Sequence, residues 1–243
     1  EIVRGYRKQG WRNHHVKLYY LQRSCYGKMK DPYYDRSEIS NSDLSELKRQ
    51  LYGGMEIDPV HAKFGNLIDH MITEPKKVDY FKLTCAGEQM TEGDFKKAEE
   101  MKKAFMRDEF ASRILPLSDT QKVMINPCQK FDYDIPFTLP VRCKWDLWMP
   151  SMGWGGDIKS TSATTQEQFE SAVRQFDYDR QRFFYMNIAG SEKDVLIGIS
   201  KENFRVFKVF IKRDDELWES GRHKCMELAF KYWTMFGDLK QKA

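Results

Sequence analysis

The feature that most constrains the fold is a predicted strand, turn and strand in the middle of the chain. Residues 141–149 have the composition of a β-strand, and a second β-like segment leads to Ile158. Between them, Pro150 and Gly153 lie in a short segment that can reverse the chain. We therefore expect a hairpin with Asp146 on its first strand and Asp157, eleven positions later, on its second strand.

This hairpin would bring two carboxylates and a lysine together. Because side chains alternate faces along a strand, Asp157 and Lys159 should project to one side while Ile158 points into the core. The backbone carbonyl of Ile158 then remains available as a metal ligand. Mg²⁺ prefers carboxylate, carbonyl and water oxygens, and a lysine beside the ion can orient an attacking water and offset phosphate charge. Taken alone, however, Asp-x-Lys is more often a pair on a surface strand.

A second pair of polar residues follows on a predicted helix. Residues 166–189 favour a helix that is interrupted near residues 176–179. Gln181 and Tyr185 are spaced as i and i+4, so they lie on one face of that helix. Their polar ends could reach a phosphate, a base edge or the lysine, or they could complete the core. Their place directly after the hairpin favours a role in the site.

An acid and an imidazole lie on an earlier predicted helix, which begins near Pro59 and ends at Glu74. Asp69 and His70 are next to the apolar face of this helix. Such a pair is more often a surface or capping pair than a metal site. Neighbouring residues on a helix point about 100° apart, so only one of the two can face a site formed by other elements.

The remaining pattern predicts an α/β fold with a mixed central sheet flanked by helices. Ser40 to Leu44 supply an N-cap for a helix that Gly53 and Gly54 end. The other expected elements are a helix over residues 91–110 with Phe95, Ala98, Met101, Phe105 and Met106 as its buried stripe, short strands over residues 123–125, 129–135 and 141–149 separated by prolines, strands over residues 194–200 and 203–211, and a closing helix over residues 214–236.

Positive charge is concentrated at the N-terminus. Residues 1–30 contain eight lysines and arginines against Glu1 alone, although the whole chain has a net charge of only +4. Aromatic residues are interleaved with these charges, a mixture that can neutralise phosphates and stack on bases. The alternative is a solvated arm whose aromatic side chains dock on the domain. The candidates for contact with DNA in this arm are Arg4, Arg7, Lys8, Arg12 and Lys17.

Length and composition exclude several classes of protein. With 243 residues and 41% apolar content, the chain can bury the core of one elaborated domain, which we expect over residues 31–243 after an arm at residues 1–30. No apolar run approaches the ~20 residues of a membrane span. Five scattered cysteines without a C-x-x-C pair argue against a disulfide framework and against a cysteine metal site. We therefore expect a cytoplasmic protein that does not contact a membrane.

Several blocks of the sequence together resemble a known family. The hairpin and the Gln181-x-x-x-Tyr185 helix are similar to the RecB-like branch of the PD-(D/E)XK nuclease superfamily. More narrowly, the chain resembles the RecE-type exonucleases of phages and prophages over about residues 31 to 210. The blocks that carry the resemblance are residues 39–44, residues 64–69, Lys144-Trp145-Asp146, Asp157-Ile158-Lys159-Ser160-Thr161 and Tyr178-Asp179-Arg180-Gln181.

The resemblance implies a Mg²⁺-dependent deoxyribonuclease, with Mn²⁺ as a substitute and one or two ions bound. Asp146, Asp157 and the Ile158 carbonyl would bind metal, and Lys159 would assist the water. Gln181 and Tyr185 would order the site or the DNA, and Arg180 would join the DNA contacts. The resemblance also implies a linear duplex substrate cut from the 5′ end, a single-strand annealing protein as partner, and a homo-oligomer.

The sequence departs from the family pattern at two positions. Where the branch often has a histidine, four residues after the glycine that corresponds to Gly65, this chain has Asp69, with His70 one step further. Either residue could be the third metal ligand. Gln129 lies in a strand where related nucleases carry an acid, which bears on a second metal ion. The cysteine spacings do not supply the iron-sulfur cluster of some relatives. An endonuclease of restriction or repair type and a non-catalytic DNA-binding module are the alternative functions.

Overall fold

The computed structural model describes residues 32–53 and 58–240. The chain divides into two compact units, residues 1–37 and 38–243, and the second contains all the helices and strands described below. They are α3 (Asn41–Tyr52), α4 (Pro59–Thr73), η2 (Pro75–Lys77), β1 (Val78–Asp79), β2 (Thr84–Cys85), β3 (Glu88–Gln89), α5 (Glu92–Arg107), α6 (Glu109–Ile114), η3 (Leu115–Leu117), β4 (Asp119–Asp132), β5 (Pro136–Met149), β6 (Trp154–Thr161), α7 (Gln166–Gln175), α8 (Tyr178–Ala189), β7 (Lys193–Ser200), β8 (Val206–Lys212) and α9 (Glu216–Lys240).

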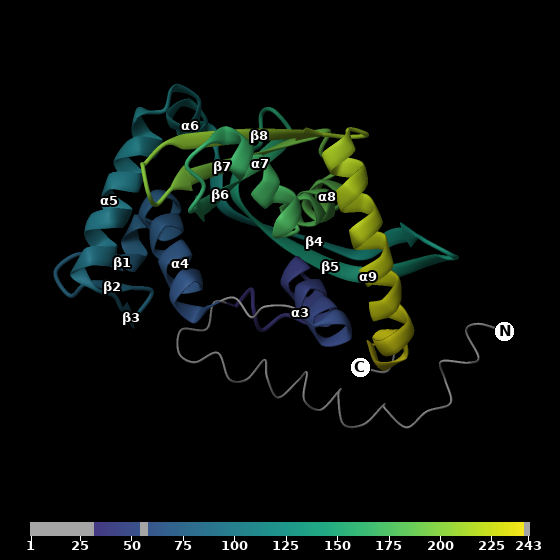
Figure 1. The fold of residues 1–243 in the computed structure, drawn as a ribbon. Helices are drawn as coiled ribbons and strands as arrows, with labels where there is room; N and C mark the ends of the chain where they lie inside the picture. The colour runs from purple at the N-terminus through teal and green to yellow at the C-terminus, as the bar shows by residue number, and fades with distance from the viewer. Residues whose placement is uncertain (1–31, 54–57, 241–243) are drawn as a thin grey trace. The chain divides into compact units, whose positions relative to one another are not determined.

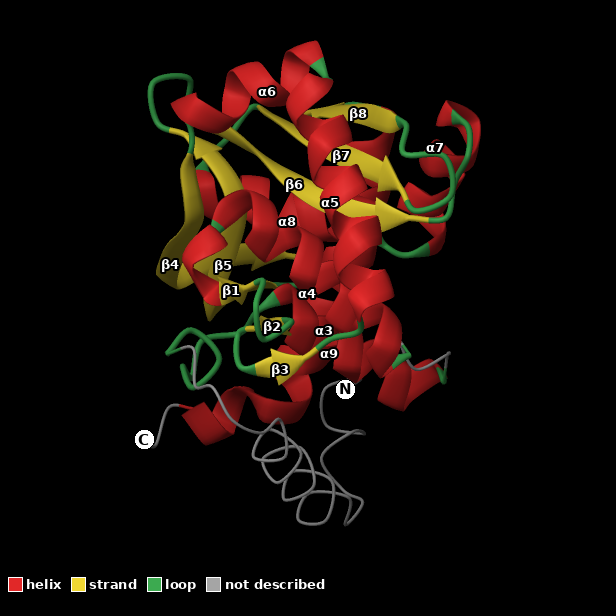
Figure 2. Ribbon diagram, turned by 90° about the vertical axis from the view of Figure 1, so that its left-hand side faces the viewer, coloured by secondary structure: helices red, strands yellow, loops and turns green. Residues whose placement is uncertain are grey.

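A five-stranded mixed sheet organises this unit. Its strand order is β4-β5-β6-β7-β8, in which β6 and β7 are parallel and the other neighbours are antiparallel. Helices α4 and α5 pack on β6 and β7 and lie in front of these strands in Figure 2. Helix α8 contacts the sheet from the opposite face, and α9, in yellow in Figure 1, crosses the long β4 and β5 strands. The expected α/β architecture is confirmed.

Local sequence signals explain where the helices begin. Ser40 and Asp43 form a capping box at the start of α3, and Gly53 ends this helix with φ of 74°. Thr91 and Asp94 form the same motif ahead of α5. The predicted start of α4 at Pro59 and its end before Pro75 are confirmed.

The predicted buried stripe of α5 is correct except at its last member. Phe95, Ala98, Met101 and Phe105 pack in the core with α4 and the central strands. Met106 is instead 47% exposed. It follows Phe105 directly, so it points about 100° away from the buried face.

Strands β4 and β5 contradict the prediction of three short strands. Each is 14 residues long: β4 continues through Pro127, and β5 begins at Pro136, continues through Pro140 and ends before Pro150. Pro127 lies where the register shifts between Asn126 and Gln129, a bulge that does not require its missing N–H. The carbonyl of Pro140 accepts a hydrogen bond from the Ile39 N–H at 2.9 Å. Proline removes a donor but keeps its acceptor, so these strands continue through it.

The hairpin between β5 and β6 is confirmed. The pairs are Leu147 with Gly156, Trp148 with Gly155, and Met149 with Trp154, and Gly153 in the turn has φ of 67°. Glycine is also required at position 155, because a Cβ there would lie 2.4 Å from the Trp145 ring.

None of the helices in the described part of the chain is long and apolar enough to cross a membrane.

Candidate active site

The site lies where β5 and β6 separate. Their pairing ends at Leu147 and Gly156, one position before Asp146 and Asp157 come level with each other. Beyond that point the Ile158 N–H donates to Asp146 Oδ2 at 2.8 Å, so a side chain takes the place of a strand carbonyl. Strand β6 meanwhile remains paired with β7 from Gly155 to Thr161. Asp157 and Lys159 are therefore held on a central strand, and Asp146 is held at the fork.

Asp157 is clamped between two cations. Lys159 Nζ lies 2.5 Å from its Oδ2, and Arg182 Nη2 lies 3.0 Å from its Oδ1. The other end of the Arg182 guanidinium lies 3.4 Å from Asp194 Oδ2. Arg182 and Asp194 are both fully buried, whereas Lys159 is one-fifth exposed. The predicted pairing of Asp157 with Lys159 on one side of β6 is thus seen directly, and Ile158 packs in the core as expected.

Of the predicted pair on α8, Tyr185 lies beside the site, together with Tyr178 and Arg182, whereas Gln181 forms no hydrogen bond with these residues. The Arg182 guanidinium lies 4.2 Å from the centre of the Tyr185 ring and 5.3 Å from the Trp145 ring. Lys159 Nζ lies 4.9 Å from the centre of the Tyr178 ring. Gln181 is half-buried, and no hydrogen bond of its amide to another described residue is present. Tyr178, Arg182 and Tyr185 follow the i, i+4, i+7 spacing of one helical face, and this spacing is a sequence signal for Tyr178 and Arg182.

Asp69 on α4 is near enough to Asp146 and Asp157 for their charges to interact, whereas His70 contacts residues of its own helix and Glu74. The Gln121 amide nitrogen, on β4, lies 3.2 and 3.0 Å from the two carboxylate oxygens of Asp69. His70 Nδ1 lies 2.8 Å from the Asn66 carbonyl oxygen, and its Nε2 lies 3.7 Å from Glu74. Of the two alternatives, the geometry favours Asp69 as the residue that can join the site.

Several buried carboxylates lie near one another in the site, and their burial and proximity raise the pKa values of Asp69 and Asp146. Burial raises the pKa of Asp146 well above its usual value, and the charges of Asp69 and Asp157 raise it further. Burial also raises the pKa of Asp69, and the charge of Asp157 adds to this shift. Burial lowers the pKa of Lys159, but nearby negative charge, first that of Asp157, more than offsets this, so the net shift is upward. Additional positive charge among the carboxylates would stabilise their ionised forms.

The donor set fits a hard divalent cation. Asp69, Asp146, Asp157 and the Ile158 carbonyl supply only oxygen ligands, as Mg²⁺ and Mn²⁺ prefer. In the described residues these side chains contact other protein groups, and no three or more His, Cys, Asp and Glu side chains are already arranged to hold a metal ion. Burial first, and then the negative charge of neighbouring carboxylates, raises the pKa of Asp69 and of Asp146, and a bound cation would offset both effects.

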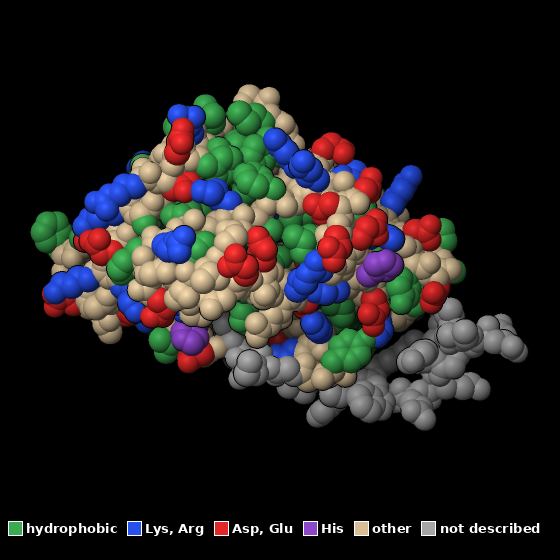
Figure 3. Space-filling view, turned by 45° about the horizontal axis from the view of Figure 1, so that its top comes forward, with side chains coloured by type: hydrophobic (Ala, Val, Ile, Leu, Met, Phe, Trp, Pro, Cys, Tyr) green, Lys and Arg blue, Asp and Glu red, His purple; other side chains and the backbone are tan. Residues whose placement is uncertain are grey.

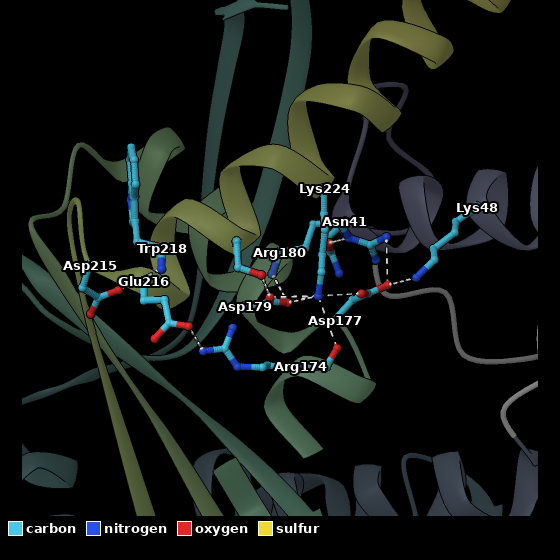
Figure 4. Close-up of polar contacts among 11 residues, drawn as sticks. Asn41, Lys48, Arg174, Asp177, Asp179, Arg180, Asp215, Glu216, Trp218 and Lys224 are labelled. Atoms are coloured by element: carbon cyan, nitrogen blue, oxygen red, sulfur yellow. Dashed lines mark hydrogen bonds and ion pairs between the residues drawn. The ribbon is translucent and has the colours of Figure 1, made fainter. Parts of the chain in front are cut away.

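Three other predicted residues or groups lie elsewhere. Gln129 is buried near the β4 bulge, where its carbonyl oxygen accepts from the Asn126 amide at 2.9 Å. Arg180 is 2% exposed, and its guanidinium donates to Asn41 (Figure 4) and to Ser45, so its burial argues against a direct contact with DNA. The basic residues Arg4, Arg7, Lys8, Arg12 and Lys17 lie outside the described residues.

The comparison that decides the family covers most of the chain. Residues 43–238 match the family model described as PDDEXK-like domain of unknown function (DUF3799). The chain belongs to this PDDEXK-like family. The matched range includes Asp69 and the whole of the β5 and β6 hairpin, so the predicted superfamily is confirmed. No curated protein matches the chain in sequence.

Several solved structures are similar to this PDDEXK-like protein. A candidate exonuclease of Eubacterium rectale has 15% identity and a TM-score of 0.58, with 87% of this chain and 88% of that chain covered. A phage-related exonuclease of Haemophilus somnus has 12% identity and a TM-score of 0.39, with 93% and 95% covered. An alkaline exonuclease of Laribacter hongkongensis has 14% identity and a TM-score of 0.36, with 84% and 92% covered. At these identities, we take only the shared fold from the first.

Proposed function

We propose that this protein is a metal-dependent deoxyribonuclease that hydrolyses DNA phosphodiester bonds. The observation that carries the proposal is the ion pair of Lys159 with Asp157 on a central strand, beside Asp146 and Asp69, in a PDDEXK-like domain. Acids and a lysine in this arrangement suit phosphate chemistry, because the acids can hold a cation and the lysine can offset the charge of a phosphate.

Each residue has a distinct role in the proposed reaction. Asp69, Asp146, Asp157 and the Ile158 carbonyl would hold Mg²⁺ or Mn²⁺, which would supply charge stabilisation at the scissile phosphate and its leaving oxygen. The Lys159 ammonium group would donate a hydrogen bond to the attacking water or to a phosphate oxygen. Arg182, which has no exposed surface, would act on Asp157 rather than on DNA. Tyr178 would limit the positions open to the Lys159 ammonium group.

Cleavage from a DNA end is the mode we favour. The support is the likeness in fold to the Eubacterium rectale protein, which is described as a candidate exonuclease. The proposed substrate is linear duplex DNA cut from the 5′ end, which would leave a 3′ single strand for an annealing protein. Release of mononucleotides from linear duplex, with covalently closed circular duplex left intact, is the expected result. If circular DNA is cut as readily as linear DNA, the protein is an endonuclease instead.

Substitutions at the site test the chemistry itself. In Asp157→Asn and Lys159→Ala, we expect Mg²⁺-dependent nucleotide release to fall by at least about 10²- to 10³-fold, the order seen when one preorganised charge-stabilising group is lost. Circular dichroism and a melting curve establish that each variant is folded. A matched control is Lys122→Ala, which removes an exposed β4 lysine that pairs with Asp119. Unchanged release in both site variants would contradict the proposed active site, whereas DNA binding without any Mg²⁺-dependent release by the native protein would leave a DNA-binding module as the function.

The basic arm at residues 1–30 remains our candidate for contact with DNA phosphates. On the face seen in Figure 3, lysine and arginine side chains are interspersed with acidic ones, so this face offers no extended basic surface. Deletion of residues 1–30 should weaken DNA binding and flatten its salt dependence, because each lost phosphate contact lowers the slope by about 0.9. An unchanged slope, measured by titration at several salt concentrations, would assign the arm to another role.

A further inference from the structure

Gln121 occupies an unusual position on β4. The strand pairs on either side of it join Thr120 to Leu147 and Lys122 to Trp145, so Gln121 lies level with Asp146 on the neighbouring strand. Its φ is 53°, in the left-handed region that non-glycine residues rarely adopt inside a strand. A backbone conformation of this kind is retained only where the surrounding contacts hold it, and it is often found at functional sites.

The side chain of Gln121 shows what holds it. Its amide nitrogen lies 3.2 and 3.0 Å from the two oxygens of Asp69, and 3.0 Å from Thr73 Oγ1. Thr73 Oγ1 in turn donates to the Asp69 backbone carbonyl at 2.9 Å and lies 3.2 Å from Asp69 Oδ1. Because a carboxylate only accepts hydrogen bonds, the amide nitrogen of Gln121 must be the donor. A residue 52 positions later in the sequence thus fixes the orientation of Asp69.

We propose that Gln121 is a positioning residue for the metal site, which orients Asp69 of α4 toward Asp146 and Asp157. The expected effect of Gln121 on DNA hydrolysis rests on the proposed nuclease function. Its expected effect on metal binding does not. The left-handed conformation aims the amide across to α4, and the amide in turn fixes the carboxylate. Residues that orient a metal ligand typically contribute about 10- to 100-fold to metal affinity or activity.

The substitution Gln121→Gly distinguishes a role in positioning Asp69 from a role in stability. Gln121→Gly removes the amide but adopts the same backbone conformation without strain, so relief of strain should offset part of the lost hydrogen bonding and keep the change in melting temperature small. The Mg²⁺ concentration for half-maximal DNA hydrolysis should nevertheless rise about 10- to 100-fold. Gln121→Asn, which tolerates the backbone but has a shorter side chain, should show a similar rise.

Asp214→Gly is the matched control. Asp214 also has a left-handed backbone, with φ of 65°, but it is exposed in the turn that follows β8. Its replacement should relieve the same kind of strain and leave the Mg²⁺ dependence unchanged. A rise in the Mg²⁺ requirement for Gln121→Gly but not for Asp214→Gly supports the proposal. Equal Mg²⁺ dependence in Gln121→Gly and the native protein overturns it.

A measurement without DNA separates this proposal from the nuclease assignment. Calorimetric titration with Mn²⁺ alone should show binding to the native protein and binding about 10- to 100-fold weaker for Gln121→Gly. If the native protein hydrolyses no DNA but this difference is present, the nuclease function fails while the positioning role stands. If Mn²⁺ binds both proteins equally, or binds neither, the positioning role fails whatever the result with DNA.

Discussion

Two ionic clusters meet helix α8, and they differ in their balance of charge. The site cluster has four carboxylates, Asp69, Asp146, Asp157 and Asp194, against Lys144, Lys159 and Arg182. The helix cluster has two carboxylates, Asp177 and Asp179, against Lys48, Arg180 and Lys224, which come from α3, α8 and α9 (Figure 4). The first has an excess of negative charge, and the second has an excess of positive charge.

The pKa shifts of the carboxylates follow this difference. Burial raises the pKa of Asp177, but the hydrogen bond from Lys48 and the neighbouring charges outweigh it, so the net shift is downward. In the site cluster, burial raises the pKa of Asp194 to about 8, and Arg182 does not offset it. The same residue types therefore serve two purposes. The cluster with excess positive charge joins helices, whereas the cluster with excess negative charge is the one that we propose binds a metal ion.

The largest expected effect comes from breaking the site cluster at Arg182. Arg182→Met would leave Asp194 buried without its cation and Asp157 with Lys159 alone, which should lower the free energy of unfolding by about 3–5 kcal/mol. Chemical denaturation measures this loss. In a protein that already carries Asp157→Asn and Asp194→Asn, the same substitution should cost much less, because no buried charge is left unpaired. An equal cost in both backgrounds would mean that Arg182 acts through packing alone.

Metal ions should stabilise the protein through the site cluster only. At a concentration 100 times its dissociation constant, Mn²⁺ or Mg²⁺ should raise the free energy of unfolding by about 2.7 kcal/mol. We expect this gain to be lost in Asp157→Asn and retained in Asp179→Asn, a matched change in the helix cluster. Thermal melts with and without the ion, with EDTA as reference, make the comparison. Equal stabilisation of both variants would place the metal elsewhere.

The helix cluster should contribute to stability without affecting hydrolysis. Lys224 Nζ lies 2.8 Å from Asp179 Oδ2, and Lys224→Met should cost about 1–2 kcal/mol, since Ser220 still donates to the buried carboxylate. Lys231→Met, also on α9, removes a more exposed pair with Glu227 and should cost at most about 0.5 kcal/mol. Both variants should hydrolyse DNA at the native rate. A lower rate for Lys224→Met would connect the two clusters functionally.

The smallest expected effect is on acid stability. Because the pKa of Asp177 in the folded protein is below its usual value of 3.8, its ionised form stabilises the fold above that value. This contribution is lost as the pH falls through 3.8 toward the lower folded pKa. Asp177→Asn should therefore flatten the dependence of stability on pH below about pH 4. Denaturant titrations at pH 3, 4 and 6 measure it, and an unchanged slope would show that Asp177 is not a source of acid sensitivity.

Much of the fold could be predicted because its signals are local. The capping box at Ser40 and the hairpin turn at Gly153 are each specified within a few residues. The long β4 and β5 strands were missed because proline was read as a strand breaker, whereas a bulge at Pro127 and the pairing of Ile39 with the Pro140 carbonyl depend on partners distant in sequence. Local rules cannot anticipate a contact of this kind.

In the candidate site, too, the residues that could be predicted are those whose signals are local in sequence. Asp146, Asp157 and Lys159 belong to one hairpin, so strand periodicity and turn position were sufficient to group them. Arg182 and Gln121 were missed because an arginine on a helix is usually a surface residue and a glutamine in a strand carries no distinctive pattern. Their importance comes from what they meet after folding, which are Asp157 and Asp69 respectively.

Asp146 lies where β5 and β6 separate, and its contacts there decide which substitution should be used to trap a complex with DNA. Its carboxylate accepts the Ile158 N–H where the strand ladder has ended. Asp146→Ala would leave this amide without its acceptor and could distort the proposed site around it. Asp146→Asn retains an oxygen in the same place while it removes the negative charge. The isosteric variant is therefore the better choice for a stalled enzyme and substrate complex with native architecture.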